Sequence, residues 1–155
     1  MSVELQAGDQ APDFTLPTDE GEVSLAALKG TSVVLYFYPK DDTSGCTVEA
    51  QDFTARKAEF EKAGAVVIGV SKDSVKKHAN FRKKYELTHA LGSDETGEML
   101  ERYGVWIEKS MYGRKYMGIE RATFLIGGDG RIKRAWRKVK VTGHAEDVLT
   151  ALRAG

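Results

Sequence analysis

Two unbroken apolar runs, 33–38 and 66–70, dominate the hydrophobic pattern of the chain. Their β-branched and aromatic residues are typical of strands covered on both faces in a parallel sheet. Each run is followed by residues that can cap a helix, and then by apolar residues at helical spacing. The pattern predicts one helix from the turn at Cys46 to about Lys62 and another that starts near Ser74. Because both connections have helical length, we expect parallel strands and a right-handed crossover.

Shorter elements are expected on either side of this central pair. Before it, the alternation of Phe14 and Leu16 between prolines predicts an edge strand that turns at Gly21. After it, the firmest feature is a β-hairpin around the glycine-rich turn 127–130. The other expected elements are a strand at 23–25, a short helix to about Leu28, a helix at 95–103, a ribbon of 105–107 and 112–117, hairpin strands at 123–126 and 131–136, and a helix from Gly143 to about Arg153. The fold class is therefore α/β, and the length fits a single domain over 1–155.

The composition limits the class of partners. Lys plus Arg total 23 and Asp plus Glu total 23, so no net field favours nucleic acid or an anionic membrane surface. No window reaches the roughly 18 apolar residues of a membrane span, and the start MSVELQAGDQ lacks the basic and apolar regions of a leader. We therefore expect a cytoplasmic protein that binds neither nucleic acid nor membranes.

Metal ligands are sparse in the sequence. The only cysteine is Cys46, and His78, His89 and His144 are far apart and have no partner close in sequence. A zinc or iron–sulfur site is therefore not expected, and the sequence contains no signal for another cofactor.

Several polar features have ordinary structural explanations. His78 falls on the apolar side of its helix and is expected to be a partly buried boundary residue rather than a catalyst. The two aspartates at 41–42 are expected to form a solvated loop rather than a cation site. The basic residues between Lys133 and Lys140 are expected to guard a solvent-facing strand edge rather than bind nucleic acid.

Cys46 is the strongest candidate for chemistry. It lies in the first turn of a predicted helix, at the carboxyl end of a buried strand, where α/β folds place their reactive groups. The helix N-terminus favours the thiolate, which is the nucleophilic form. Thr43 could present its hydroxyl to the sulfur or act only as a helix cap, and Pro39 could shield the sulfur or only end the strand. The alternative for Cys46 itself is a small buried hydrophobic residue.

The segment around Cys46, YFYPKDDTSGCTVEAQDF, resembles the active-site segment of the peroxiredoxins. These are thiol peroxidases with a thioredoxin-like fold, and the branch most similar is the bacterioferritin-comigratory, or peroxiredoxin Q, type. The similarity extends through GDQAPDFTLP, GVSKDS, GIERATFLI and KVKVTGHAEDVL. It implies a central mixed sheet flanked by helices, an N-terminal β-hairpin extension, and a monomer or weak homodimer.

The resemblance also implies which residues form the site. The family motif of proline, threonine and peroxidatic cysteine maps onto Pro39, Thr43 and Cys46. The remote arginine of the family falls on Arg121, which without the resemblance would be read as a surface charge beside a strand. Glu49 matches a family glutamate that resembles an arginine-orienting group.

These residue types suit the reduction of a peroxide. Arg121 stays protonated and could stabilise both the thiolate and the charge that develops on the leaving oxygen. The backbone N–H groups of Gly45 and Cys46, together with the Thr43 hydroxyl, could hold the peroxide oxygens. Cys46 would become a sulfenic acid.

The chain departs from the family where a resolving cysteine is usual. That position, five residues after Cys46, is Gln51, and the second common location falls near Lys83 or Lys84. We therefore expect a one-cysteine cycle that is completed by an external thiol: thioredoxin, a glutaredoxin-like protein or a small thiol. Ser44 stands where the family usually has proline and is expected to leave the first helical turn looser.

Two other functions are alternatives for a chain with one cysteine. A thioredoxin-like disulfide reductase would need a Cys-x-x-Cys motif, and Thr43 occupies the place of its first cysteine. A redox-sensing or binding module would need only that oxidation of Cys46 changes a partner interface. The rate of peroxide consumption separates such a module from a peroxidase.

Overall fold

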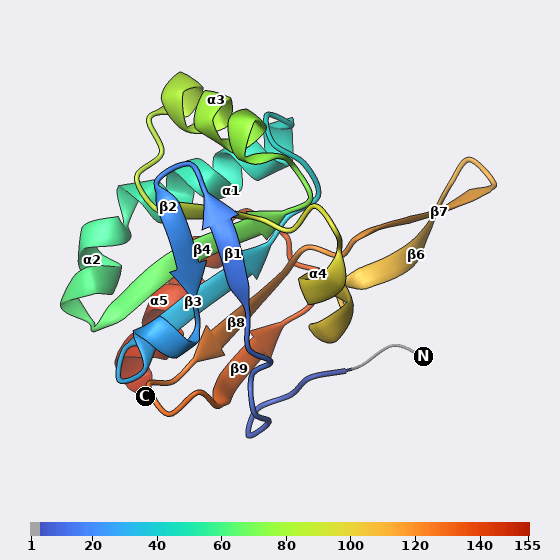
Figure 1. Cartoon of the computed structure of the whole chain (residues 1–155). Helices are drawn as coiled ribbons and strands as arrows, with labels where there is room; N and C mark the ends of the chain where they lie inside the picture. The colour runs from blue at the N-terminus through green and yellow to red at the C-terminus, as the bar shows by residue number, and fades with distance from the viewer. Residues whose placement is uncertain (1–3) are drawn as a thin grey trace.

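A five-stranded mixed sheet with the order β5-β4-β3-β8-β9 forms the centre of the computed structural model, which describes residues 4–155 (Figure 1). Its strands are β3 (Ser32–Phe37), β4 (Ala65–Ser71), β5 (Ala90–Ser93), β8 (Ala122–Ile126) and β9 (Ile132–Trp136). The pairs β3–β4 and β4–β5 are parallel, whereas β8 runs antiparallel to both of its neighbours. The mixed sheet and the hairpin of β8 and β9 were both predicted. The prediction that the chain has no leader was made from its first ten residues, and residues 1–3 of these lie outside the described residues.

Both predicted central strands lie where the apolar runs are. Every residue of β3 after Ser32 is buried, and in β4 only Val66 is partly exposed. Side chains that alternate along a strand face opposite sides of the sheet, so a continuous apolar run is what a strand with two covered faces requires. The parallel pairing of these two strands is confirmed.

Different elements cover the two faces of the sheet. Val34 and Tyr36 belong to a cluster with residues of the helices α1 (Ser44–Ala55), α2 (Lys57–Lys62) and α5 (His144–Ala154). The opposite face packs against a second group of elements: the hairpin β1 (Thr15–Thr18) and β2 (Gly21–Ser24), the turn of 3-10 helix η1 (Ala26–Leu28), and α4 (Glu98–Arg102). Figure 1 shows this N-terminal hairpin in front of the sheet, as the expected extension.

The predicted single helix up to Lys62 is wrong, because the segment forms two helices. Arg56 interrupts it with φ −106° and ψ 8°, and its backbone N–H donates to the Phe53 carbonyl. Its guanidinium reaches Glu146 of α5 at 2.6 Å. The break changes the direction of the chain while keeping both Phe53 and Phe60 fully buried.

Two further boundaries differ from the predictions. The short strand β5 was not expected, since Gly92 and Ser93 interrupt its apolar pattern. The helix expected at 95–103 begins only at Glu98, because Gly97 has the left-handed φ of 81° and cannot continue a right-handed helix. The helix α3 (Val75–Tyr85) begins next to Ser74, whose hydroxyl accepts from Lys77 N–H as a cap.

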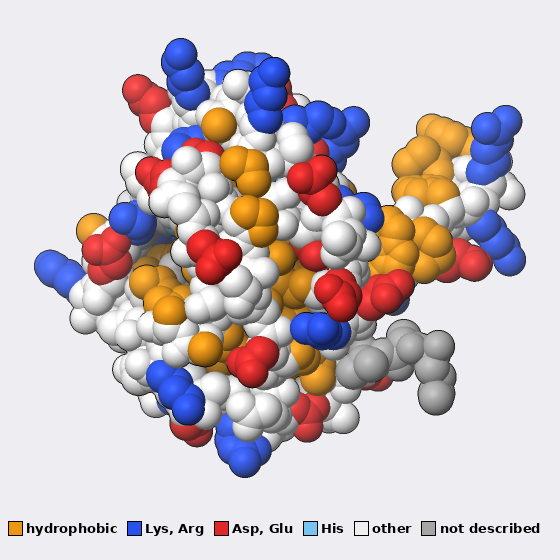
Figure 2. All heavy atoms as spheres, in the orientation of Figure 1, with side chains coloured by type: hydrophobic (Ala, Val, Ile, Leu, Met, Phe, Trp, Pro, Cys, Tyr) orange, Lys and Arg blue, Asp and Glu red, His pale blue; other side chains and the backbone are white. Residues whose placement is uncertain are grey.

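The ribbon of β6 (Trp106–Met111) and β7 (Arg114–Ile119) extends away from the rest of the molecule (Figure 1). Tyr112 and Gly113 form its turn with φ values of 52° and 79°. Both angles are positive, as a two-residue hairpin turn of type I′ requires. The large apolar side chains at its end are exposed and are visible in Figure 2, with Tyr112 98% exposed.

The basic segment between Lys133 and Lys140 lies along and after the edge strand β9. Lys133 and Arg134 are exposed as predicted, but Arg137 is partly buried and forms an ion pair with Glu120 at 2.7 Å. Among the described residues, no helix is long and apolar enough to cross a membrane.

Candidate active site

Cys46 lies in the first turn of α1, directly beyond the carboxyl end of β3. Thr43 precedes the helix with an extended backbone, and the first helical hydrogen bond runs from Thr47 N–H to its carbonyl. The N–H groups of Gly45 and Cys46 therefore belong to the helix start, where they have no intrahelical acceptor. The Cys46 side chain is almost fully buried, with 1% of the residue exposed.

Arg121 contacts the sulfur from the opposite strand. It directly precedes β8, whose Ala122 pairs with Phe37 at the end of β3, so the antiparallel register brings it level with the start of α1. Its Nη2 atom lies 3.3 Å from the Cys46 sulfur. A Cβ atom at Gly45 would lie 3.4 Å from the same nitrogen, so the guanidinium lies against the backbone of the helix start.

Glu49 binds the other nitrogen of this guanidinium. Arg121 Nη1 donates to Glu49 Oε1 at 2.6 Å, and the glutamate residue is only 1% exposed. Burial raises the Glu49 pKa to about 7, although the nearby Arg121 charge opposes that rise. Burial works against the charge of Arg121, but Glu49 and Cys46 together hold its pKa above the usual value. The Arg121 guanidinium therefore binds both the Glu49 carboxyl group and the Cys46 sulfur in a buried site.

Thr43 and Pro39 belong to the loop between β3 and α1, which leads to Cys46. Thr43 is exposed and donates its hydroxyl hydrogen to the Lys40 carbonyl at 2.9 Å, so its side chain does not cap α1, which was one of the two roles that the sequence allowed. Pro39 is partly buried and follows Tyr38, whose N–H still donates to Val70 of β4. The sheet pairing therefore continues to the residue before Pro39.

The loop between β3 and α1 is more deeply held than predicted. Asp41 is only 8% exposed and bonds to His78, which is 0% exposed, so a solvated loop is wrong for Asp41 and a boundary position is wrong for His78. Asp42 does lie at the surface, with φ 60°, and binds Lys84 at 2.8 Å. An aspartate three residues after a buried run carries no local sign of burial, because its partner comes from α3, a helix distant in the sequence.

The other two histidines also have partners that the sequence did not reveal. His89 contacts the Tyr36 hydroxyl at 2.6 Å and the Thr54 hydroxyl at 3.0 Å, and burial lowers its pKa to about 3. His144 contacts the Thr123 hydroxyl at 2.7 Å, and burial lowers its pKa to about 4. Both are therefore neutral core residues at neutral pH.

Lys109 of the ribbon is a neighbour of the site that sequence reasoning missed. It is partly buried, and burial together with the charge of Arg121 lowers its pKa, while the Cys46 side chain acts in the opposite direction. The Lys109 side chain, from the middle of β6, therefore lies within electrostatic range of the sulfur. The weak hydrophobic pattern of the segment around Lys109 gave no indication that this lysine lies near Cys46.

A thiol held by an arginine at a helix start agrees with the comparisons to known proteins. The family model described as AhpC/TSA family matches residues 7–135. The chain belongs to this family. It is 54% identical over 153 residues to a putative peroxiredoxin bcp of Coxiella burnetii, covering 98% of this chain and 100% of that protein. It is 47% identical over 154 residues to the peroxiredoxin Bcp of Bacillus subtilis, covering 99% and 97%.

Solved structures give the same result. A peroxiredoxin Q of Xanthomonas campestris matches with a TM-score of 0.88 at 45% identity, over 99% of this chain and 97% of that one. Peroxidoxin BcpB of Mycobacterium tuberculosis matches with a TM-score of 0.86 at 33% identity, over 97% and 98%. The chain is thus a peroxiredoxin of the Bcp, or peroxiredoxin Q, type, and the thioredoxin-like fold and the thiol peroxidase class predicted from the sequence are confirmed.

Proposed function

We propose that this peroxiredoxin reduces hydrogen peroxide and small alkyl hydroperoxides through Cys46, in a one-cysteine cycle. The observation that carries the proposal is the 3.3 Å contact between Arg121 Nη2 and the only thiol of the chain. A permanently charged guanidinium at this distance favours the thiolate. A structural study of the Xanthomonas campestris bacterioferritin comigratory protein concerns its alkyl peroxide reduction activity, which supports the choice of substrate class.

In the first step, the Cys46 thiolate attacks one oxygen of the hydroperoxide. The sulfur–oxygen bond forms as the oxygen–oxygen bond breaks, and the leaving alkoxide or hydroxide takes a proton from water. Sulfur is oxidised to sulfenic acid and the peroxide is reduced to an alcohol or water. Arg121 stabilises the charge on the leaving oxygen, while the N–H groups of Gly45 and Cys46 hold the substrate.

The remaining residues orient these groups. Glu49 fixes the guanidinium of Arg121 through the 2.6 Å contact. The Thr43 hydroxyl donates a hydrogen bond to the Lys40 carbonyl, and its oxygen can still accept a hydrogen bond from the peroxide. Pro39 keeps bulk water from the sulfur.

The second step needs another molecule. The 155 residues contain one cysteine, so no disulfide can form within the chain. An external thiol attacks the sulfenic acid, water leaves, and a second thiol releases Cys46 from the mixed disulfide. Since Cys46 is 1% exposed, the first turn of α1 must open to admit the reductant, and Ser44 in place of proline favours that opening. Thioredoxin, a glutaredoxin-like protein and a small thiol are the candidate reductants, and the cytoplasmic location stays a prediction.

Peroxide turnover with a panel of these reductants tests the proposal. We expect the wild type to consume peroxide far faster than free cysteine, and the Cys46→Ser variant to lose this activity. Mass spectrometry of the oxidised protein should detect sulfenic acid that disappears on addition of a productive thiol. A wild-type rate equal to that of free cysteine would leave the redox-sensing module as the better explanation.

A further inference from the structure

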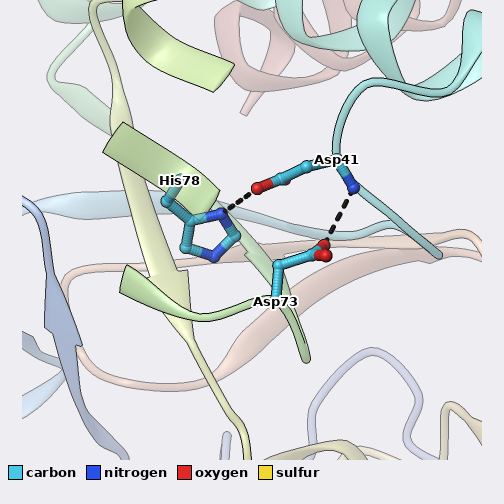
Figure 3. Close-up of side chains that lie close together, drawn as sticks. All are labelled: Asp41, Asp73 and His78. Atoms are coloured by element: carbon cyan, nitrogen blue, oxygen red, sulfur yellow. Dashed lines mark hydrogen bonds and ion pairs between the residues drawn. The ribbon is translucent and has the colours of Figure 1, made fainter. Parts of the chain in front are cut away.

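A buried hydrogen-bonded cluster joins the loop before α1 to the neighbouring strand and helix. Asp41 of that loop contacts His78 of α3, with 2.7 Å between Oδ2 and Nδ1 (Figure 3). The backbone N–H of Asp41 donates to Asp73 Oδ2 at 2.8 Å. The three residues come from different segments and are 8%, 0% and 9% exposed in the order Asp41, His78 and Asp73.

Each member of the cluster is held by further contacts. The Tyr38 hydroxyl donates to Asp41 Oδ1 at 2.6 Å. The Ser71 hydroxyl donates to Asp73 Oδ2 at 2.7 Å, and the Ser93 hydroxyl donates to the Asp73 carbonyl at 2.6 Å. Strands β3, β4 and β5 thus all contribute to it or adjoin it at their carboxyl ends.

The cluster is better explained as a hydrogen-bonded clamp than as a metal site. Ligand atoms of Asp41, Asp73 and His78 lie within 4.8 Å of one another, as a metal would require. However, both nitrogens of His78 and both oxygens of Asp41 already have hydrogen-bond partners. A cavity of about 270 Å³ beside the cluster has no net negative lining that would favour a cation, because three aspartates and three lysines line it: Asp41, Asp42, Asp73, Lys40, Lys77 and Lys84.

The contact between Asp41 and His78 must contain one proton. His78 Nε2 lies 3.0 Å from the Gly92 carbonyl, which can only accept, so this nitrogen carries hydrogen. In a neutral imidazole Nδ1 would then carry a lone pair, which would face the Asp41 carboxylate and be repelled by it. A proton on either Nδ1 or Oδ2 removes that repulsion and gives a short charge-assisted or acid hydrogen bond.

We propose that Asp41, His78 and Asp73 are positioning residues that hold the active-site loop for reaction with peroxide. The loop contains Pro39 and Thr43 and ends where α1 presents Cys46. Asp41 anchors its middle to the core, and Thr43 is tied to the same loop through Lys40. Without the contact of Asp41 with His78, the loop would be tied to α3 through the exposed contacts of Asp42.

The proposal rests on the peroxidase function proposed above, and it predicts which chemical step depends on the clamp. Oxidation needs the loop and the helix start in one arrangement, and small displacements of reacting groups cost large factors in rate. Reduction of the sulfenic acid needs the site to open. Loss of the clamp should therefore slow oxidation without slowing reduction by a small thiol.

Two amide replacements of His78 separate positioning from simple stability. In His78→Asn the amide nitrogen stands near the place of Nδ1 and can still donate to Asp41. In His78→Gln it stands near the place of Nε2 and can still donate to Gly92 but not to Asp41. Both variants replace a buried ring by a smaller amide, so both are expected to lose stability, measured by urea unfolding.

We expect His78→Gln to lower the second-order rate of Cys46 oxidation by roughly ten- to a hundredfold and His78→Asn to retain most of it. Reduction of the sulfenic acid by a small thiol should not be slowed in either. Amide hydrogen exchange at Asp41 should be faster in His78→Gln than in His78→Asn or wild type. Equal oxidation rates in the two variants, or losses that merely follow their stabilities, would overturn the proposal.

A second pair covers the case in which a His78 variant does not fold. Asp41→Asn can keep both side-chain contacts with a neutral histidine, whereas Asp41→Ala removes them. Oxidation should be slow in Asp41→Ala and largely rescued in Asp41→Asn, and failure of that rescue contradicts the clamp. The exchange of the Asp41 amide does not depend on peroxidase activity. A wild type that fails to outpace free cysteine would therefore refute the proposed function separately.

Discussion

The Nη2 atom of Arg121 lies 3.3 Å from the Cys46 sulfur, although 75 positions separate the two residues in the chain. The antiparallel pairing of β3 with β8 brings them together. Since Nη1 of the same guanidinium binds Glu49, Arg121 holds the thiol and the carboxyl group in one arrangement.

Replacement of Arg121 by lysine should lower the rate of Cys46 oxidation by about 10²- to 10³-fold, the range for loss of one preorganised charge-stabilising donor. Lysine keeps the charge but cannot bind sulfur and carboxyl through two fixed nitrogens. Rapid mixing with hydrogen peroxide measures this rate. Arg137→Lys is the matched control, because Arg137 is also a partly buried, ion-paired arginine, with Glu120 as its partner. Its oxidation rate should equal that of the wild type.

Glu49 should make the protein less stable as pH rises from about 4.5 to about 7, the interval between its ordinary and folded pKa values. Over this interval the folded state binds more protons at Glu49 than the unfolded state does, so ionisation on a rise in pH costs stability. The full effect above this interval is on the order of 3 kcal/mol.

Urea unfolding of wild type and Glu49→Gln across this pH range measures the effect. The difference in unfolding free energy, variant minus wild type, should increase with pH and then level off above about 7. A difference that is constant with pH would show that Glu49 titrates in the folded state as it does in the unfolded chain.

His89 should act in the opposite direction. Burial lowers its pKa from 6.5 to about 3. Between these two pH values the histidine is protonated in the unfolded chain but neutral in the folded core. Its contribution is therefore present above pH 6.5 and is lost as pH falls toward about 3. His89→Gln should lower stability at neutral pH by about 1–3 kcal/mol, because it disturbs buried hydrogen bonds.

The test is the loss of stability on acidification, which should be smaller in His89→Gln than in wild type. Glu49 is present in both proteins, so its opposite pH dependence cancels in the comparison. Parallel pH profiles of the two proteins would contradict a depressed histidine pKa.

Gly69→Ala should destabilise the core by about 1–3 kcal/mol through overpacking. An added Cβ would lie 2.6 Å from Cζ of Tyr36, whose ring cannot move without disturbing its contact with His89. Urea unfolding measures the change. Gly118→Ala is the control, since its Cβ would meet the flexible Lys109 side chain at 3.2 Å and should cost less. Equal losses in the two variants would argue against a rigid contact at Tyr36.

Some misses in the predictions have a common physical cause. Hydrophobic periodicity shows which residues of a segment face the core. It therefore located β3, β4 and α3, but it did not show the break at Arg56, because Phe53 and Phe60 on either side are both buried. No Gly or Pro within 52–60 marks that break, and the Glu146 that Arg56 binds lies 90 positions away. Strand β5 is short and contains Gly92, so its identity depends on pairing with β4 rather than on its own pattern.

The sequence by itself determined the buried strand, the helix start with Cys46, and the family motif of Pro39, Thr43 and Cys46. These features are local, because strand and helix periodicity and capping act within a few residues. The absence of a second cysteine also follows from the sequence, and with it the need for an external thiol.

Only the tertiary structure decided what surrounds the sulfur. The contact of Arg121 with Cys46 depends on strand register, the raised pKa of Glu49 depends on burial, and the buried contact of Asp41 depends on His78 of α3. The free energy of a buried polar group depends on its partners and on excluded water, and both come from segments distant in the chain. For this reason a local pattern could identify the thiol but could not identify the groups that control it.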